Sequence, residues 1–130
     1  MKSKPRASVN GFFVVQNKKT AKKEKRVLER SIEARFLRRL KELWPEAKTR
    51  KMNGYGNRSW PDRLVVLPFG AKPLIEFKRP GGELSSGQAN LIKELKGMGH
   101  SVYVCDDAEQ AILFCEFEVS NAKRKKIQAA

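Results

Sequence analysis

Residues 62–78 read DRLVVLPFGAKPLIEFK, and this stretch predicts the centre of the fold. It contains two short apolar runs, 63–67 and 73–78, each rich in residue types that favour β-strands. The segment PFGA at 68–71 supplies turn residues between the two runs. We therefore expect two neighbouring antiparallel strands.

Three charged side chains are expected to meet at one end of these strands. Strand side chains alternate between faces, so Glu76 and Lys78 point one way while Ile75 and Phe77 point the other way, into the core. Asp62 begins the preceding strand and lies near the level of Glu76 and Lys78 if the two strands pair through the turn. Opposite charges on an apolar strand are costly unless they are paired or functional.

Further elements extend from this pair of strands. A helix is predicted from about Glu24 to Trp44, before Pro45, because apolar residues recur there at helical spacing. After the two strands, a strand–helix–strand crossover implies parallel pairing and hence a mixed sheet flanked by helices, an α/β fold. The other predicted elements are a strand at 48–52, a loop at 53–59, a helix at 86–98, a strand at 101–105 and a short helix at about 108–115 capped by Asp106 or Asp107.

The net charge of +14 is concentrated at the two ends of the chain. Residues 1–30 hold ten basic and two acidic residues, and residues 121–130 hold four basic residues and no acidic one. The sequence thus predicts a basic N-terminal arm over 1–25, a globular domain over 26–116 and a basic tail over 117–130 that is disordered after Ser120. Within the arm, the apolar segment 11–15 is expected either to dock as a short strand or to contact a partner. Such basic arms suit a polyanion, and nucleic acid is the commonest one.

Composition also excludes several functional classes. No apolar run is long enough to cross a bilayer, and the N-terminus lacks the apolar core of a signal peptide, so we expect a cytoplasmic protein with no membrane partner. The two cysteines, Cys105 and Cys115, are interpreted as reduced core thiols. His100 is the only histidine and is expected at the surface, which argues against Ser-His and Cys-His hydrolases and against a zinc site.

The predicted cluster of Asp62, Glu76 and Lys78 suits hydrolysis of a phosphodiester. Mg²⁺ and similar hard cations prefer carboxylate oxygens and water. A bound cation neutralises the phosphate and lowers the pKa of its water, and a nearby lysine can orient that water or stabilise the charge that develops.

Two further side chains are candidates for this site. Glu33 lies on the same helical stripe as Phe36 and Leu40, so it either binds the metal, directly or through water, bonds Lys78, or pairs at the rim with an arginine such as Arg35 or Arg39. Glu29, one turn earlier, is the backup. Ser85 and Gln88 form a capping box by spacing, and Gln88 is alternatively expected to face the cluster and hold water or phosphate.

Several residues are candidates for contacts with DNA. The 53–59 loop precedes the site, so Arg58 is placed to grip a phosphate and Tyr55 or Trp60 to stack on a base, although Trp60 alternatively packs against the sheet. Arg79 is a candidate phosphate clamp. The arm adds Lys18, Lys19, Lys22 and Lys23.

The motifs Trp60-Pro61-Asp62 and Ile75-Glu76-Phe77-Lys78 resemble the Pro-Asp…(Asp/Glu)-x-Lys pattern of the restriction-endonuclease-like nucleases. The continuation Glu83-Leu84-Ser85-Ser86-Gly87-Gln88, with Leu95, Gly99 and 102–105 after it, resembles the VRR-NUC family, especially its small stand-alone members from phages and bacteria. The resemblance covers about residues 27–115. One departure is Gly87, where many relatives have a bulkier residue, which puts the orientation of Gln88 in doubt.

The resemblance implies a restriction-endonuclease-like core similar to Holliday-junction resolvases. It implies metal ligation by Asp62, Glu76 and the backbone carbonyl of Phe77, a catalytic role for Lys78, and supporting roles for Glu33 and Gln88. It further implies a Mg²⁺- or Mn²⁺-dependent endonuclease that acts as a homodimer on structured or branched DNA, in a bacterial or phage-infected cell. The alternatives are a non-catalytic basic nucleic-acid-binding protein, which the arms fit but the acidic cluster does not, and a small ribosome-associated or structural basic protein.

Overall fold

The computed structural model describes the backbone of residues 6–130 and the side chains of residues 20–130. A mixed sheet of four strands forms the centre, as predicted, and its strand order is β1-β2-β3-β4. β2 pairs antiparallel with β1 and β3, whereas β3 and β4 are parallel. The elements are α1 (Arg6–Leu43), β1 (Lys48–Lys51), β2 (Arg63–Val66), the 3₁₀ turn η1 (Pro68–Gly70), β3 (Leu74–Phe77), α2 (Ser86–Gly97), β4 (Val102–Cys105) and α3 (Ala108–Ala129).

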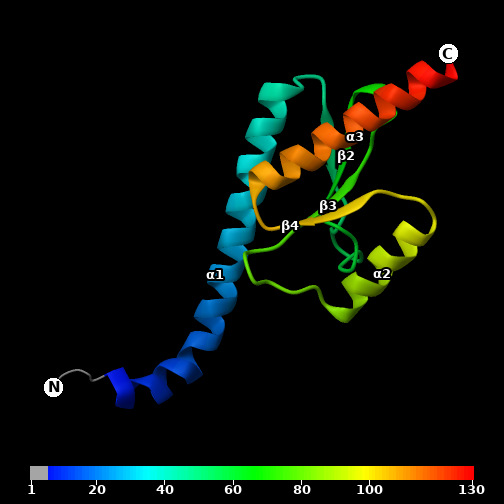
Figure 1. Cartoon of the computed structure of the whole chain (residues 1–130). Coiled ribbons are helices and arrows are strands. Elements are labelled where there is room, and N and C mark those ends of the chain that lie inside the picture. Colours follow the sequence, from blue (N-terminus) through cyan, green and yellow to red (C-terminus); the bar gives the residue numbers. More distant parts are fainter. Residues whose placement is uncertain (1–5) are drawn as a thin grey trace.

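Helices cover both faces of this sheet (Figure 1). On one face, α1 and α3 pack over a large apolar cluster that includes Phe36, Phe77 and Cys115. On the other face, α2 packs over a smaller cluster built on Leu74 and Ile92. β3 is buried along its whole length, so it lies at the centre of the packing.

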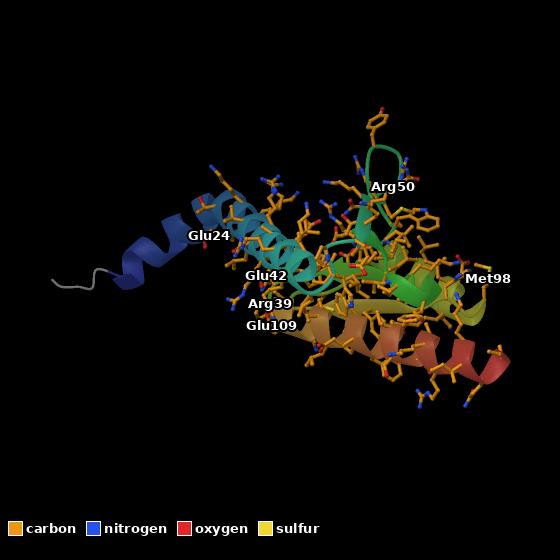
Figure 2. All side chains as sticks on the ribbon, turned by 90° about the horizontal axis from the view of Figure 1, so that it is seen from above. Glu24, Arg39, Glu42, Arg50, Met98 and Glu109 are labelled. Atoms are coloured by element: carbon orange, nitrogen blue, oxygen red, sulfur yellow. The ribbon has the colours of Figure 1, made fainter. Side chains whose placement is uncertain are left out.

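The predicted helix start near Glu24 is wrong, because α1 begins at Arg6 and runs for 38 residues. At 1.5 Å per residue, that helix is about 57 Å long, and its N-terminal half projects beyond the sheet (Figures 1 and 2). The apolar segment 11–15 belongs to this helix and forms no strand. Sequence reasoning treated the lysine-rich segment as an arm because of its charge, yet Lys, Ala, Glu and Arg are all good helix formers.

The C-terminal tail is also helical, which corrects the expected end of the last helix near residue 115 and the predicted disorder. Asp107 caps α3, accepting from the backbone N–H of Gln110 at 3.1 Å. Beyond Cys115, Val119 and Ala122 still pack against the core. This contact supports the helix as far as the basic residues 123–126. The last residues of α3 are exposed, and most are of types with high helix propensity.

The expectations for the two cysteines and the histidine are confirmed. Cys105 and Cys115 are buried free thiols, and His100 is exposed. Gly99, at φ +93°, closes the end of α2 in the left-handed conformation that glycine adopts without strain. Among residues 6–130, no helix combines the length and apolar character needed to cross a membrane.

Candidate active site

Asp62 and Glu76 face each other across β2 and β3. Arg63 pairs with Ile75, so the next step along the ladder brings Asp62 opposite Glu76. Asp62 Oδ2 accepts from the backbone N–H of Phe77 at 2.7 Å, and the Asn53 side-chain amide donates to Asp62 Oδ1. These two bonds hold the Asp62 carboxylate against the end of β3.

Glu76 is the one charged side chain that is fully buried among the described residues, with 2% exposure. One of its oxygens, Oε2, lies 3.2 Å from Lys78 Nζ and accepts from Gln88 Nε2 at 3.1 Å. The other oxygen, Oε1, is buried and has no hydrogen-bond partner within the described part of the chain. A buried carboxylate oxygen without a partner is costly, so this atom fits a metal ion or its water.

The electrostatics of the pair favour a cation. Burial, followed by the charge of Asp62, raises the pKa of Glu76 to about 7, against the opposing influence of Lys78. Burial also raises the pKa of Asp62, and the charge of Glu33 adds to it, while the Phe77 N–H and Lys78 oppose the rise. Two carboxylates thus lie close together, largely shielded from water, with one lysine beside them. A divalent cation would stabilise the ionised form of both carboxylates.

Gln88 takes part in the capping box and also bonds Glu76, so the cap and the orientation toward the cluster occur together, while a hold on water or phosphate stays a prediction. Ser85 Oγ accepts from the backbone N–H of Gln88 at 3.1 Å, and Gln88 Oε1 accepts from the backbone N–H of Ser85 at 2.9 Å. This box leaves the Gln88 Nε2 group free to donate to Glu76. The start of α2 therefore positions the carboxylate of β3.

Gly87 allows the start of α2 to approach the loop before Asp62. A Cβ atom at position 87 would lie 2.7 Å from Ser59 Oγ, closer than such atoms approach in proteins. A larger residue would have to displace the Ser59 side chain. The departure from the family pattern at Gly87 thus has a local packing reason, and Gln88 still reaches the site.

Glu33 lies at the edge of the site with a partner that sequence reasoning missed. Arg63 Nε donates to Glu33 Oε2 at 2.5 Å, and Arg63 Nη1 donates to Thr49 Oγ1 at 3.2 Å. The expected rim partner Arg39 instead bonds Glu42 and Glu109, joining α1 to α3 (Figure 2). The Glu33 charge contributes to the raised pKa of Asp62, so Glu33 lies near the site, although its carboxylate pairs with Arg63.

Arg63 and Asn53 were both absent from the sequence-based site. A signal for Arg63 was available, because it follows Asp62 directly and strand alternation turns it to the opposite face, toward α1. No comparable signal marked Asn53, since its contact with Asp62 depends on how the 53–59 loop folds back beside β2.

The candidate DNA-contact residues are spread around the site rather than gathered in it. Tyr55 and Arg58 are exposed on the 53–59 loop, whereas Trp60 packs against the smaller apolar cluster that includes Leu74 and Ile92. Arg79 lies next to Lys78 on the wall of a hollow of about 140 Å³ that opens beside the cluster. Lys22 and Lys23 are exposed on α1, and the side chains of Lys18 and Lys19 fall outside the described residues.

Within the described part of the chain, no group of three or more His, Cys, Asp or Glu residues could hold a metal. Asp62 and Glu76 are the two carboxylates that the strand register places opposite each other. This number suits Mg²⁺, which binds through one or two carboxylates and retains several waters.

Comparison with known proteins gives three matches. A family model described as the VRR-NUC domain matches residues 6–108, which includes most of the basic N-terminal segment. A protein from Acyrthosiphon pisum secondary endosymbiont phage 1, named "Putative nuclease p44", is 39% identical over 54 residues, which are 42% of this chain. The matched segment spans 58% of that phage protein, less than two thirds of its length.

A solved structure described as a VRR_NUC domain is similar in fold, with a TM-score of 0.60 and 23% sequence identity. The match covers 68% of this chain and 95% of that one. The mixed sheet with flanking helices is therefore the arrangement of that domain.

Proposed function

This chain belongs to the VRR-NUC domain family, and on that premise we propose that it is a Mg²⁺- or Mn²⁺-dependent endonuclease that cuts structured or branched DNA. The observation that carries this proposal is the convergence of Asp62, Glu76 and Lys78 at one end of β2 and β3. The phage relative's name supports nuclease activity, and the net charge of +14 supports a polyanionic substrate.

Asp62 and Glu76 would hold the ion, with the Phe77 backbone carbonyl as the further ligand that the family resemblance implies. The unpartnered Glu76 Oε1 supports this assignment, because a cation supplies the partner that the protein does not. When bound, the ion would neutralise phosphate charge and lower the pKa of its water.

The protein's own groups orient the reacting atoms. Gln88 and Lys78 fix one Glu76 oxygen, and the other oxygen, which has no partner among the described residues, would be available to the ion. Asn53 and the Phe77 N–H fix the rotamer of Asp62. Lys78, which is half-buried, would donate a proton or a charge-assisted hydrogen bond where negative charge develops on the phosphate. Glu33, held by Arg63, would act as a supporting residue.

The decisive experiment is a cleavage assay on a labelled four-way junction, a fork and a matched duplex, with Mg²⁺, Mn²⁺ or EDTA. The wild type should cut only with a divalent ion. E76Q and K78M should bind DNA but cut about 10³-fold more slowly or worse, since each removes a group that acts directly on the reaction. E83Q, which changes an exposed carboxylate on the following loop, is the matched control.

Two outcomes would overturn parts of this proposal. If E76Q and K78M cut at the wild-type rate, the site is wrong. If the wild type binds DNA and never cuts it with any divalent ion, the chain is a nucleic-acid-binding protein without nuclease activity.

We further propose that two copies act together, because paired cuts in a branched substrate need two sites. Leu113 and Phe117, one turn apart on α3 and 63% and 56% exposed, supply an apolar surface that a second copy would cover. Light scattering should give twice the monomer mass of 14.8 kDa, and L113D/F117D should shift it to the monomer. A monomeric wild type, with or without DNA, would contradict the dimer.

A further inference from the structure

A second polar hollow lies at the opposite end of the sheet from the acidic cluster. The cluster is at the C-terminal ends of the parallel strands β3 and β4, whereas this hollow is lined by Lys72 and His100, which precede those strands, and by α3. At roughly 3.3 Å per residue, four-residue strands separate the two places by about 13 Å or more. Its volume of about 480 Å³ falls within the roughly 300–1,000 Å³ range of ligand sites.

Three lysines and one glutamate are the charged side chains around this hollow, and its lining comes from three separate parts of the chain. Lys72 comes from the turn before β3, His100 from the turn before β4, and Lys125 and Lys126 from the last turns of α3. The acidic side chain in the lining, Glu118, accepts a hydrogen bond from the Tyr103 hydroxyl and is already engaged. Lysines that only complement the C-terminus of α3 would not account for Lys72, which reaches the same hollow from another part of the chain.

An aromatic side chain completes the wall. Phe69 in η1 lines the hollow, is 44% exposed, and has Lys123 Nζ at 5.6 Å from its ring centre. Its φ of +62° is a left-handed conformation that bulky residues rarely adopt. Proteins bind single-stranded nucleic acid through this combination of an exposed aromatic ring and lysines. The ring stacks on a base of any kind, and the lysines bind the phosphates.

We propose that this hollow binds an unpaired nucleotide of the DNA substrate, with the base against Phe69 and the flanking phosphates on Lys72, Lys125 and Lys126. The inference rests on the proposed function and deepens it, because it selects DNA with an unpaired segment, such as a fork or flap, over fully paired DNA. At roughly 3.4 Å per base pair, the span to the acidic cluster corresponds to about four base pairs or more. One branched substrate can therefore reach both places.

The test measures binding in EDTA, so its result does not depend on cleavage. Dissociation constants are determined for a fork with two dT10 arms and for a duplex of the same paired length. Three variants of the full chain are compared with the wild type: F69G, which suits the left-handed backbone while removing the ring; F69Y, which restores a ring; and K125A/K126A. The matched control is K93A/K96A, which removes two exposed lysines from α2 on the other face of the sheet.

We expect F69G and K125A/K126A each to weaken fork binding by about tenfold, with duplex binding weakened no more than in K93A/K96A. F69Y should restore fork affinity. In the wild type, dT10 should compete with the fork, whereas dTMP at the same nucleotide concentration should not.

Three results would overturn the proposal. Equal losses for fork and duplex, matching those of K93A/K96A, would mean that the lysines act only through overall charge. Full fork affinity in F69G would remove the base contact. Competition by dTMP as strong as that by dT10 would identify a free nucleotide, rather than a DNA strand, as the ligand. None of these results bears on whether the wild type cuts DNA with Mg²⁺, so the two proposals fail separately.

Discussion

The two faces of β3 carry different kinds of side chain. On one face, Ile75 and Phe77 are buried among Phe36, Cys105 and other apolar side chains. On the other face, Leu74 joins the apolar cluster under α2, but Glu76, two residues later, is equally buried beside Lys78. The apolar face supports folding, whereas the charged end of the opposite face lowers the stability of the fold and provides the candidate chemistry.

The largest expected contrast is between I75A and E76Q. Removing the buried Ile75 side chain should lower the free energy of unfolding by about 2–5 kcal/mol. E76Q should leave it unchanged or raise it, because a neutral amide avoids burial of a charge. Urea unfolding in EDTA, followed by tryptophan fluorescence, measures both.

The pH dependence provides the control for this contrast. The pKa of Glu76 is raised from 4.5 to about 7 in the folded protein. The stabilisation of the folded state that this shift produces is therefore fully present below pH 4.5 and is lost as the pH rises through 7. E76Q should lack that loss, and identical pH profiles for E76Q and the wild type would contradict the assignment.

A second pair of variants separates the two roles of Gln88. Q88E keeps an acceptor for the Ser85 N–H but replaces the donor to Glu76 with a like charge, so cleavage should slow by about tenfold or more while stability changes little. S85A removes the cap and should cost about 0.5–2 kcal/mol of stability. Single-turnover rates and unfolding curves would show the separation, and equal losses of rate in both variants would refute it.

The thiols on the apolar face should make the fold sensitive to alkali. Burial raises the pKa of both Cys105 and Cys115 from 9 to about 12. Because the unfolded chain releases these protons above pH 9 and the folded chain keeps them, stability should fall as the pH rises, by on the order of 1 kcal/mol per thiol at pH 10. C105A/C115A should show a shallower fall between pH 8 and 10, whatever its stability at neutral pH.

The ion pair at the sheet edge tests whether Glu33 belongs to the charged end. Glu33 and Arg63 are each about one-fifth exposed, so their coupling energy should be about 1 kcal/mol in a double-mutant cycle of stability. If Glu33 also supports the site, E33Q should slow cleavage more than R63Q does. Equal slowing in E33Q, R63Q and the double variant would mean that Glu33 only holds Arg63.

The smallest effect, on DNA binding, is expected for side chains that lie on neither face of β3. Lys22 and Lys23 are exposed on the projecting part of α1. K22A/K23A should weaken DNA binding a few-fold, and the slope of log affinity against log salt should become shallower by about 0.9 for each phosphate that the variant no longer neutralises. An unchanged slope would mean that this segment of α1 does not touch DNA.

The antiparallel pairing of β2 with β3 and the parallel pairing that follows the crossover through α2 could be predicted from the sequence. Alternation along 74–78 assigned Glu76 and Lys78 to one face, and the turn at 68–71 set the register that brings Asp62 opposite Glu76. These relations depend on neighbours that are close in sequence or joined by a tight turn, where local geometry leaves few alternatives. The motif resemblance to the VRR-NUC family was readable for the same reason.

Only the tertiary structure decided the rest, because it depends on contacts between distant segments. Arg63, rather than Arg35 or Arg39, pairs with Glu33 because β2 passes beside α1. Both terminal helices are longer than expected, and packing of α3 on the core extends one of them past residues that charge alone marked as a tail. The basic hollow around Phe69 exists only where two turns meet the end of α3. Local propensity and alternation fix the strands, but the partner of each exposed or half-buried charge is set by which elements fold side by side.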